Sequence, residues 1–306
     1  MVFALGVIFN ADGAFFSWDT HRDMLRQVSV IGILATGMTV VIIAGGIDLA
    51  VGSILGLCAV VFSLCSIHAG WHPAAACGVT LAVGLGCGAI SGSLAARFRI
   101  QPFVATLAMM VFARGLAKLA SGGQKISTAV QQADGTYRYV SVPPVFDLLG
   151  ARIAGENVAV VTLILIACLA LCGLFLSRMV WGRQIYALGG NEEAARFSGI
   201  PVRATTVLAY AISGLLCAVA GICQAGQELQ GDPEAGSTYE LSAIAMVVIG
   251  GTSLRGGQGR IWLTCLGILI IGYLEKILSI NAVGEETRLM LTGAIIVSAV
   301  LLQKNT

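Results

Sequence analysis

The residue of this sequence whose chemistry most needs an explanation is Asp48. It is the only formally charged residue from Gln27 to Ala96, and it follows the helix-breaking pair Gly45-Gly46. An aspartate at membrane depth costs about 2.5–3.5 kcal/mol on insertion scales, so it needs a partner or a role. Unwound backbone is tolerated there only when it is buried in protein or faces water. We weigh three interpretations: the N-cap of a helix that begins at Leu49 in a short cytoplasmic turn, a structural or gating hinge, and a substrate contact. The cap is favoured on residues alone.

A second informative segment predicts a short, self-contained helix. Asn191 can cap its N-terminus, and Glu192 and Glu193 suit the positive end of a helix. Gly199 fits the position after the C-terminus, and Pro201 prevents the helix from continuing. Two turns of helix are unstable alone, so this piece needs something to dock on. The alternatives are a protein-docking element and a solvated loop. The candidate docking residues are Asn191, Glu192, Glu193, Ala194, Ala195, Arg196 and Gly199.

A third segment, 248–260, is rich in glycine and follows an apolar run that is too short to span a membrane. It predicts a half-helix and an irregular loop. A phosphate-binding loop of the Walker A type needs a Gly-Lys pair, and none of the four lysines follows a glycine. If ATP drives this protein, another chain must hydrolyse it.

The sequence contains no convincing catalytic or metal-binding set. No paired carboxylates have acid–base partners, and there is no credible Ser/His/Asp combination. The nine cysteines lie in apolar runs without a CxxC pair, where cysteine behaves as a small hydrophobe. We therefore expect no enzyme activity and no cofactor.

Composition explains what surrounds these segments. The chain has 306 residues, of which 57% are hydrophobic and 11% charged, with a mean hydropathy of +0.88. Soluble domains are about 45–50% apolar and about 25% charged. Soluble enzymes, disordered chains and nucleic-acid binders are disfavoured, the last also by a net charge of only +2. Long uninterrupted apolar runs indicate an all-α polytopic membrane protein rather than an outer-membrane barrel.

The apolar runs predict the membrane passes of one transmembrane domain, residues 1–306. The first run, Met1–Phe9, is too short to cross, and we interpret it as the remnant of a truncated span, favouring a missing upstream segment. The other runs are Val28–Ala44, Leu49–Ile67, Ala74–Ala96, Pro102–Ala120, Val158–Leu176, Val207–Ala225, the shorter Leu241–Gly250, Ile261–Leu278 and Leu289–Leu302. This gives about ten transmembrane or broken helices.

The connections carry two further predictions. Segment 121–156 is an external loop in which Asp134-Gly135 indicates a hairpin. Segment 178–206 is cytoplasmic, because this choice places nine Lys and Arg residues inside and five outside, in agreement with the positive-inside rule. The external loop from Gln227 to Glu240 then carries four acidic residues and no basic one.

Several side chains within the spans suggest packing. Small residues at four-residue spacing, Gly84-Gly88-Gly92 and Gly52-Gly56, predict helix–helix contact faces. Arg114 and Lys118 lie one turn apart near the outer end of their span. They are expected to reach the membrane interface or to line a water-filled path.

Four motifs follow one another along the chain: Thr36–Thr39 with Gly45–Ser53, Gln101–Leu107, Gly190–Ala195 with Ser198–Ile200, and Ile249–Leu254 with Gly256-Gly257. In this order they resemble the permease subunits of bacterial ABC importers for monosaccharides of the ribose, xylose, arabinose and galactose type. The third motif is similar to that family's cytoplasmic EAA-x3-G coupling pattern, here Glu193, Ala194, Ala195 and Gly199.

The resemblance implies a cobalamin-importer-like permease fold in the bacterial cytoplasmic (inner) membrane. It implies a second permease copy, a cytoplasmic ATPase that docks on residues 191–199, and a periplasmic or extracellular sugar-binding protein that carries most of the selectivity. Gly45, Gly46, Asp48, Gly250 and Gly251 become candidates for the inner gate or translocation path, and Asp48 keeps a structural role ahead of sugar contact.

The hypothesis is alternating access, driven by ATP hydrolysis in partner subunits. The rival is a secondary transporter driven by an ion gradient, with Asp48 as the ion or proton site.

Overall fold

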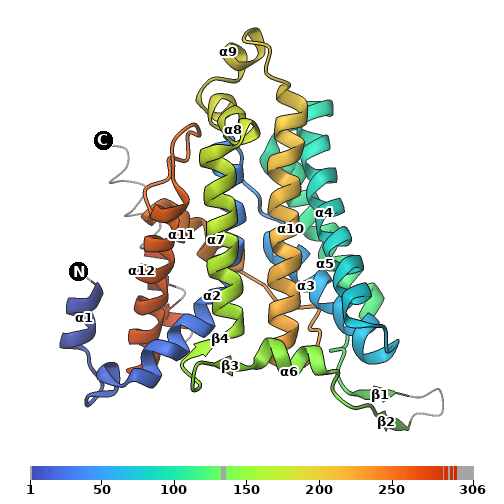
Figure 1. Ribbon diagram of the computed structural model, residues 1–306, viewed down its shortest axis with the longest axis vertical. Helices are drawn as coiled ribbons and strands as arrows, with labels where there is room; N and C mark the ends of the chain where they lie inside the picture. Colours follow the sequence, from blue (N-terminus) through green and yellow to red (C-terminus); the bar gives the residue numbers. More distant parts are fainter. Residues whose placement is uncertain (1, 132–135, 285, 289, 292, 295–306) are drawn as a thin grey trace.

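The computed structural model describes residues 2–131, 136–284, 286–288, 290–291 and 293–294, and it is mostly helical (Figure 1). Seven helices in these residues are long and apolar enough to cross a membrane. They are α2 (Trp18–Ile43), α3 (Val51–Ser63) with the π-helical turn Leu64–His68, α4 (Pro73–Phe98), α5 (Pro102–Ser121), α7 (Val160–Arg178), α10 (Val202–Glu228) and α12 (Ile261–Ile280).

These spans correspond to the predicted runs, with different ends. α2 begins at Trp18, ten residues before the predicted start, because the charged turns that precede the apolar run are also helical. α10 likewise extends past its apolar run at both ends. The predicted run Leu241–Gly250 is the short helix α11 (Tyr239–Ile249), and Met1–Phe9 contains α1 (Val2–Ile8). Most of the predicted run Leu289–Leu302 lies outside the described residues.

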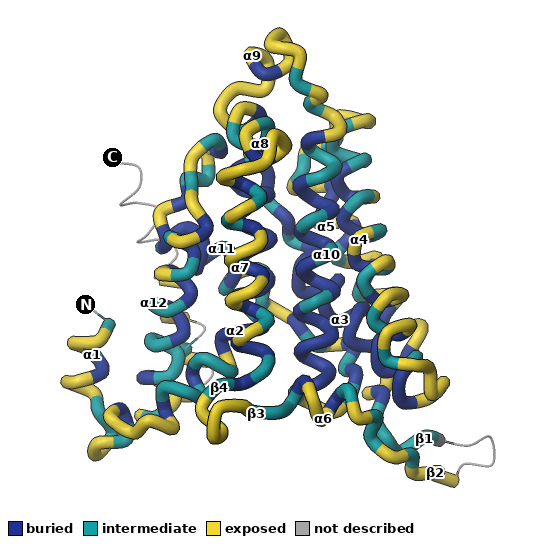
Figure 2. Tube along the Cα trace, in the orientation of Figure 1, coloured by how far each residue is buried: buried dark blue, intermediate teal, exposed yellow. Residues whose placement is uncertain are grey.

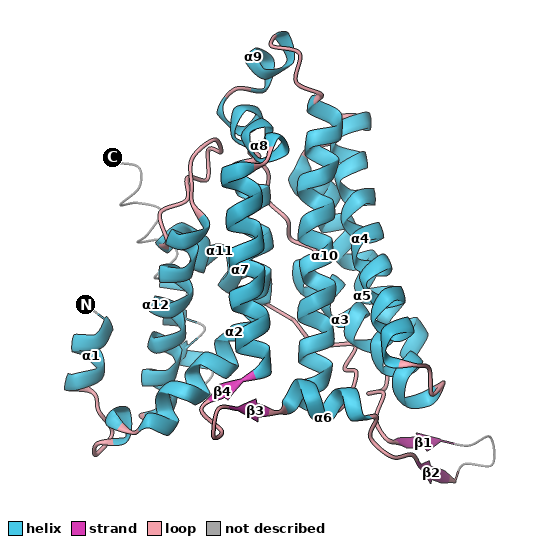
Figure 3. Cartoon of the chain, in the orientation of Figure 1, coloured by secondary structure: helices cyan, strands magenta, loops and turns pink. Residues whose placement is uncertain are grey.

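The short elements lie at the two ends of the bundle (Figure 3). One end carries the strands β1 (Ala129–Gln131), β2 (Tyr137–Tyr139), β3 (Arg152–Ile153) and β4 (Val158–Ala159), together with α6 (Pro144–Gly150). The opposite end carries α8 (Val180–Gly190) and α9 (Glu192–Phe197). Between α1 and α2 lies the 3₁₀ turn Ala14–Phe16. β1 and β2 pair antiparallel, which confirms the predicted hairpin, although its Asp134-Gly135 turn lies outside the described residues.

Burial divides the spans into a centre and a periphery (Figure 2). In the most apolar stretches of α2, of α3 with its π turn, and of α10, 83%, 78% and 67% of the residues are buried. The corresponding values for α4, α5, α7 and α12 are 28% to 33%. An apolar helix that exposes most of its surface is expected to face lipid or another subunit, so α2, α3 and α10 form the core of this polytopic protein.

The two glycine patterns behave differently. Gly84 and Gly88 of α4 pack directly on the backbone of α10 around Gly214, where a Cβ on Gly88 would lie 3.0 Å from the Gly214 nitrogen. This confirms the predicted helix–helix face. Gly52 and Gly56 of α3 instead contact carbonyl oxygens in the loop 229–238. The prediction of a helix partner was wrong there, because spacing identifies a small-residue face and leaves its partner open.

That same loop, 229–238, is fastened by α5 and the segment after it. The Arg114 guanidinium donates to the carbonyl oxygens of Pro233 and Ala235, the latter at 2.8 Å. Lys118 Nζ lies 2.5 Å from Glu234 Oε1, and Lys125 Nζ lies 2.9 Å from Asp232 Oδ2. Arg114 thus makes an internal contact with this loop, which the sequence did not predict.

Candidate functional site

The predicted short helix is present as α9, and both of its ends are capped. Asn191 Oδ1 accepts the Ala194 N–H at 2.9 Å. At the other end, the Ile200 N–H reaches the Ala195 oxygen and the Gly199 N–H reaches the Arg196 oxygen, both at 3.1 Å. This is the Schellman arrangement, and Gly199 adopts the left-handed φ of 80° that it requires. Local sequence signals therefore define this helix completely.

α9 projects at the tip of the molecule, next to α8 and the start of α10 (Figure 1). Ala195 is its one buried residue, whereas Glu192, Glu193 and Arg196 are exposed. Phe197 is 79% exposed, although it is aromatic. The motif did not single out Phe197, but an isolated apolar residue in a polar helix is a signal for a contact surface.

Behind α9, three glycine-containing segments meet backbone to backbone, and we call this contact the glycine junction. The segments are residues 43–46, 189–190 and 256–257. α8 ends at Gly189-Gly190, which packs on the end of α2 and on the loop after α11. A methyl group on Gly189 would overlap the Ile43 carbonyl oxygen and would lie 2.6 Å from the Gly257 nitrogen. The Gly257 N–H donates to that Ile43 oxygen at 2.9 Å. Only residues without a side chain permit such close packing.

The predicted gate residues Gly45 and Gly46 lie in this junction. A Cβ on Gly256 would lie 2.8 Å from Gly45 Cα, and a Cβ on Gly46 would overlap the Tyr210 hydroxyl. That hydroxyl donates to Ile47 O at 3.4 Å. The break after α2 is thus held on one side by the loop after α11 and on the other by α10.

Gly250 and Gly251 lie apart from that contact. They end α11, and Gly250 packs against the Leu263 carbonyl of α12. It is the later glycines of the same loop, Gly256 and Gly257, that touch the segments 43–45 and 189–190. The loop is also tied to α8, because the Tyr186 hydroxyl donates to Gly259 O at 2.8 Å. Burial raises the pKa of Tyr186 and nearby Arg260 lowers it, with a net increase that keeps the phenol a donor.

Asp48 is 1% exposed and has two hydrogen-bond partners. Its Oδ1 accepts the Ala50 N–H at 3.0 Å, and its Oδ2 accepts the Ser213 hydroxyl of α10 at 2.8 Å. α3 begins at Val51 and its N-cap residue is Ala50, so the prediction that Asp48 is the N-cap of a helix beginning at Leu49 was wrong. The carboxylate joins the break after α2 to the middle of α10, in an interior position rather than in an exposed turn.

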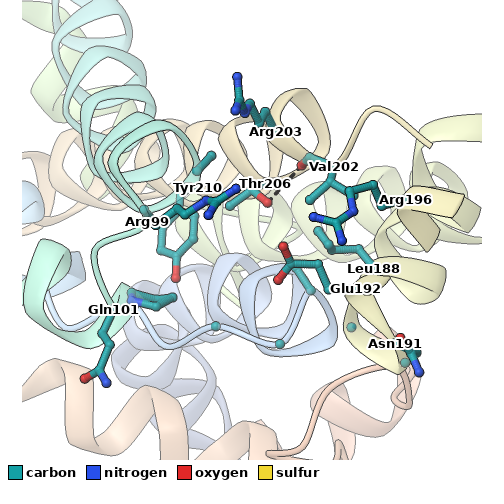
Figure 4. A pocket seen from close by; sticks show the side chains of 18 of the residues that line it. Arg99, Gln101, Leu188, Asn191, Glu192, Arg196, Val202, Arg203, Thr206 and Tyr210 are labelled. Atoms are coloured by element: carbon teal, nitrogen blue, oxygen red, sulfur yellow. Dashed lines mark hydrogen bonds between the residues drawn. The ribbon is translucent and has the colours of Figure 1, made fainter. Parts of the chain in front are cut away.

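A cavity of about 740 Å³ opens beside the junction (Figure 4). Its walls include Gly45 and Gly46 from the break, Gly189 to Glu192 from the end of α8 and the start of α9, and Tyr210 from α10. Asp48, Gly250 and Gly251 do not line it. Four arginines and one glutamate do, which makes its charge positive: Arg99, Arg196, Arg203, Arg255 and Glu192. The cavity therefore joins the predicted docking helix to part of the predicted gate.

Among the described residues, no group of three or more His, Cys, Asp or Glu is placed to hold a metal ion. All nine cysteines are free and are buried or half-buried. The site offers close backbone contacts and a positively charged cavity.

An apolar bundle with a broken central helix and a helix that projects from one end defines a polytopic membrane permease. The family model described as branched-chain amino acid transport system / permease component matches residues 22–300, and the chain belongs to this family. Members are the membrane component of a transport system, which works with a separate ATPase and a substrate-binding protein. The membrane component itself is not the enzyme.

Named relatives cover nearly the whole chain. The ribose import permease protein RbsC of Escherichia coli (strain K12) is 38% identical over 290 residues, 94% of this chain and 86% of that protein. RbsC of Bacillus subtilis (strain 168) is 39% identical over 283 residues, 92% and 84% of the two chains. The xylose transport system permease protein XylH of Escherichia coli (strain K12) is 34% identical, with 96% and 87% covered. No solved structure matches the chain.

Proposed function

We propose that this chain is the translocation subunit of an ATP-driven importer that passes a monosaccharide inward by alternating access. The substrate class is supported by the relatives, which are named for the import of ribose and the transport of xylose. Each aligns with this chain over 84% or more of its own length, so the comparison includes the regions that form the gate and the docking helix.

The observation that carries the mechanism is the contact of Gly189 with Ile43 and Gly257. α9 follows α8 directly, and the last residues of α8 touch both the end of α2 and the loop after α11. A displacement of α9 by an ATPase would therefore move the two broken segments that border the cavity. Because the backbones of these segments touch without intervening side chains, a displacement of α8 cannot be absorbed by side-chain rearrangement.

The partners follow from the two ends of the bundle. The ATPase docks on α9 through Asn191 to Arg196, Gly199 and the exposed Phe197, and the external end receives the sugar-binding protein. A second permease copy, identical or related, packs beside this one in the inner membrane. The protomer has about ten membrane-spanning or broken helices in a cobalamin-importer-like arrangement. Gly45, Gly46, Asp48, Gly250 and Gly251 are its candidates for the inner gate or the translocation path.

The test is a double substitution, Glu193→Ala with Gly199→Ala, in the complex reconstituted with its ATPase and binding protein. Gly199→Ala strains the left-handed C-terminal residue, and Glu193→Ala removes an acid from the first turn. We expect ATP hydrolysis to continue and ribose or xylose uptake to fall at least about tenfold, the effect of ~1.4 kcal/mol. Arg178→Ala is the control at the same end, and it should transport normally. Unchanged uptake by an assembled double variant would contradict the coupling role.

A further inference from the structure

A second cavity lies on the side of the bundle, near the same end as α9. Its volume is about 700 Å³, and it lies between the end of α4, the end of α7, the start of α8 and the start of α10. The lining residues that matter for its chemistry are Arg97, Phe175, Trp181, Arg203, Val207 and Leu208. The proposed docking and gate residues of the preceding sections do not line it.

We call this second cavity the lipid-side groove, or the groove. Its apolar floor is formed by Phe175, Val207 and Leu208, and its rim by Trp181, Arg97 and Arg203. Phe175, Val207 and Leu208 are half-buried apolar residues. Phe175 belongs to α7, a span that exposes most of its apolar surface, and the two others belong to the first turns of the more buried α10. Trp181 lies at the rim and is 41% exposed. Tryptophan is enriched where the membrane core meets the headgroups, because its ring is apolar and its N–H is polar. The groove thus spans the depth at which a lipid changes from acyl chain to headgroup.

Two arginines supply the charge of the rim. Arg97 lies in the last turn of α4, and Arg203 lies in the first turn of α10. Both are exposed, and neither has an acidic partner within 4.0 Å in the part of the chain that the structure describes. A guanidinium binds phosphate oxygens through paired N–H donors, and two such groups at one rim match a single phosphate diester.

We propose that this groove binds an anionic phospholipid of the cytoplasmic leaflet, with its phosphate on Arg97 and Arg203 and an acyl chain along Val207 and Phe175. The charge of the rim favours an anionic lipid over a zwitterionic one. An apolar floor that continues into membrane-spanning helices favours a lipid over a soluble anion.

The position of Arg203 links this lipid to the coupling machinery. Arg203 and Ala96 line both cavities, so the first turn of α10 separates the groove from the inner cavity. In Figure 4 the Arg203 side chain points away from Glu192. α10 begins five residues after α9 ends. A bound lipid therefore holds the helix start that follows the coupling helix.

The experiment measures lipid retention by native mass spectrometry on the full-length protein in nanodiscs of phosphatidylglycerol and phosphatidylethanolamine. The variant is Arg97→Ala with Arg203→Ala. The matched control is Arg178→Ala with Arg183→Ala, which removes the same charge from the same end without touching the groove. The variant loses the charge-assisted hydrogen bonds to the phosphate, so its retained phosphatidylglycerol should fall by at least about tenfold. The control should retain it.

Two further variants distinguish a lipid seated in the groove from a general effect of surface charge. Ala204→Trp fills the groove and leaves both arginines in place, so it should also displace phosphatidylglycerol. Arg97→Lys with Arg203→Lys keeps the charge but removes the paired guanidinium donors, so it should retain less phosphatidylglycerol than wild type, whereas a general effect of surface charge would leave retention unchanged. Equal retention by wild type and the Arg97→Ala/Arg203→Ala variant, or an equal loss in the control, would overturn the proposal. So would a variant that keeps its lipid and dissociates from a second permease copy, because the groove would then be a subunit interface.

Discussion

At the scale of the residue, Asp48 is the position at which local sequence and tertiary structure lead to different conclusions. Sequence placed it in a short turn, whereas the structure buries it against Ser213, 165 positions further along the chain. Both of its carboxylate oxygens accept hydrogen bonds, one from the Ala50 N–H and one from the Ser213 hydroxyl. A carboxylate whose acceptors are satisfied in this way stabilises the broken segment against α10.

The first prediction uses this pairing. Asp48→Ala leaves the Ala50 N–H and the Ser213 hydroxyl without their acceptor, and it should cost about 1–3 kcal/mol of stability. Asp48→Asn keeps an acceptor for one partner and a donor for the other, so it should retain most uptake and melt close to wild type. Thermal unfolding in detergent and uptake in vesicles measure both effects. Abolished uptake in a stable Asp48→Asn variant would instead favour the ion-driven transporter.

The second prediction concerns the glycine junction. Gly189→Ala places a methyl group against the Ile43 oxygen, so the junction must open, and uptake should fall by about tenfold or more. The neighbouring Gly190→Ala is the matched control, because a Cβ at Gly190 meets nothing within 4 Å. Uptake and ATPase activity of the two variants are compared in the same complex. Equal activity of both would show that this contact carries no movement.

At the scale of the element, the loop 229–238 turns back between α3 and α5. Ile126 and Gly231 form a two-hydrogen-bond bridge at 2.8 Å, and Lys125 pairs with Asp232 beside it. The sequence showed the acidic loop and the basic side chains of α5 as separate features. In the structure, Arg114 and Lys118 of α5 bind this loop through a hydrogen bond and an ion pair.

The third prediction is the pH dependence of the ion pair between Lys125 and Asp232. Burial raises the pKa of Asp232, but the hydrogen bonds from Lys125 and the Glu234 N–H and the charge of Arg114 outweigh this, so the net pKa is lowered. The hydrogen bond to Asp232 raises the pKa of Lys125. Asp232 therefore contributes stability above its usual pKa, and this is lost as the pH falls through the lower folded value. Lys125 contributes below its usual pKa, and this is lost as the pH rises through the higher folded value.

It follows that the difference in melting temperature between wild type and Asp232→Asn should be constant from about pH 5 to about pH 9. It should shrink only at more acidic or more alkaline pH. Asp147→Asn, in α6 at the same end of the bundle (Figure 3), is a control of the same chemistry. A difference that changes steeply near neutral pH would contradict the assignment of the pair.

At the scale of the whole molecule, the two ends of the bundle are built from different elements. α8 and α9 lie at one end, and the strands with α6 lie at the other (Figure 3). The central spans α2, α3 and α10 connect the two. The positive-inside rule predicts that the α9 end lies on the cytoplasmic side.

The fourth prediction tests this orientation with two equally exposed aromatic residues. Tyr139 in β2 and Phe197 at the end of α9 are each 79% exposed. In intact cells a membrane-impermeant maleimide should label Tyr139→Cys, and it should label Phe197→Cys only after permeabilisation. The native cysteines are buried or half-buried, so wild type gives the background. The reverse pattern would invert the topology.

The sequence alone determined the membrane class, the positions of the spans within the described residues and both caps of α9. Apolar run length, charge position and capping depend on residues close together in the chain. The tertiary structure decided that Gly189 meets Ile43 and Gly257 and that Asp48 binds Ser213. It also decided that Gly52 and Gly56 face a loop. These contacts join residues that are far apart in the chain, and such partners are selected by the packing of whole helices, which no local pattern records.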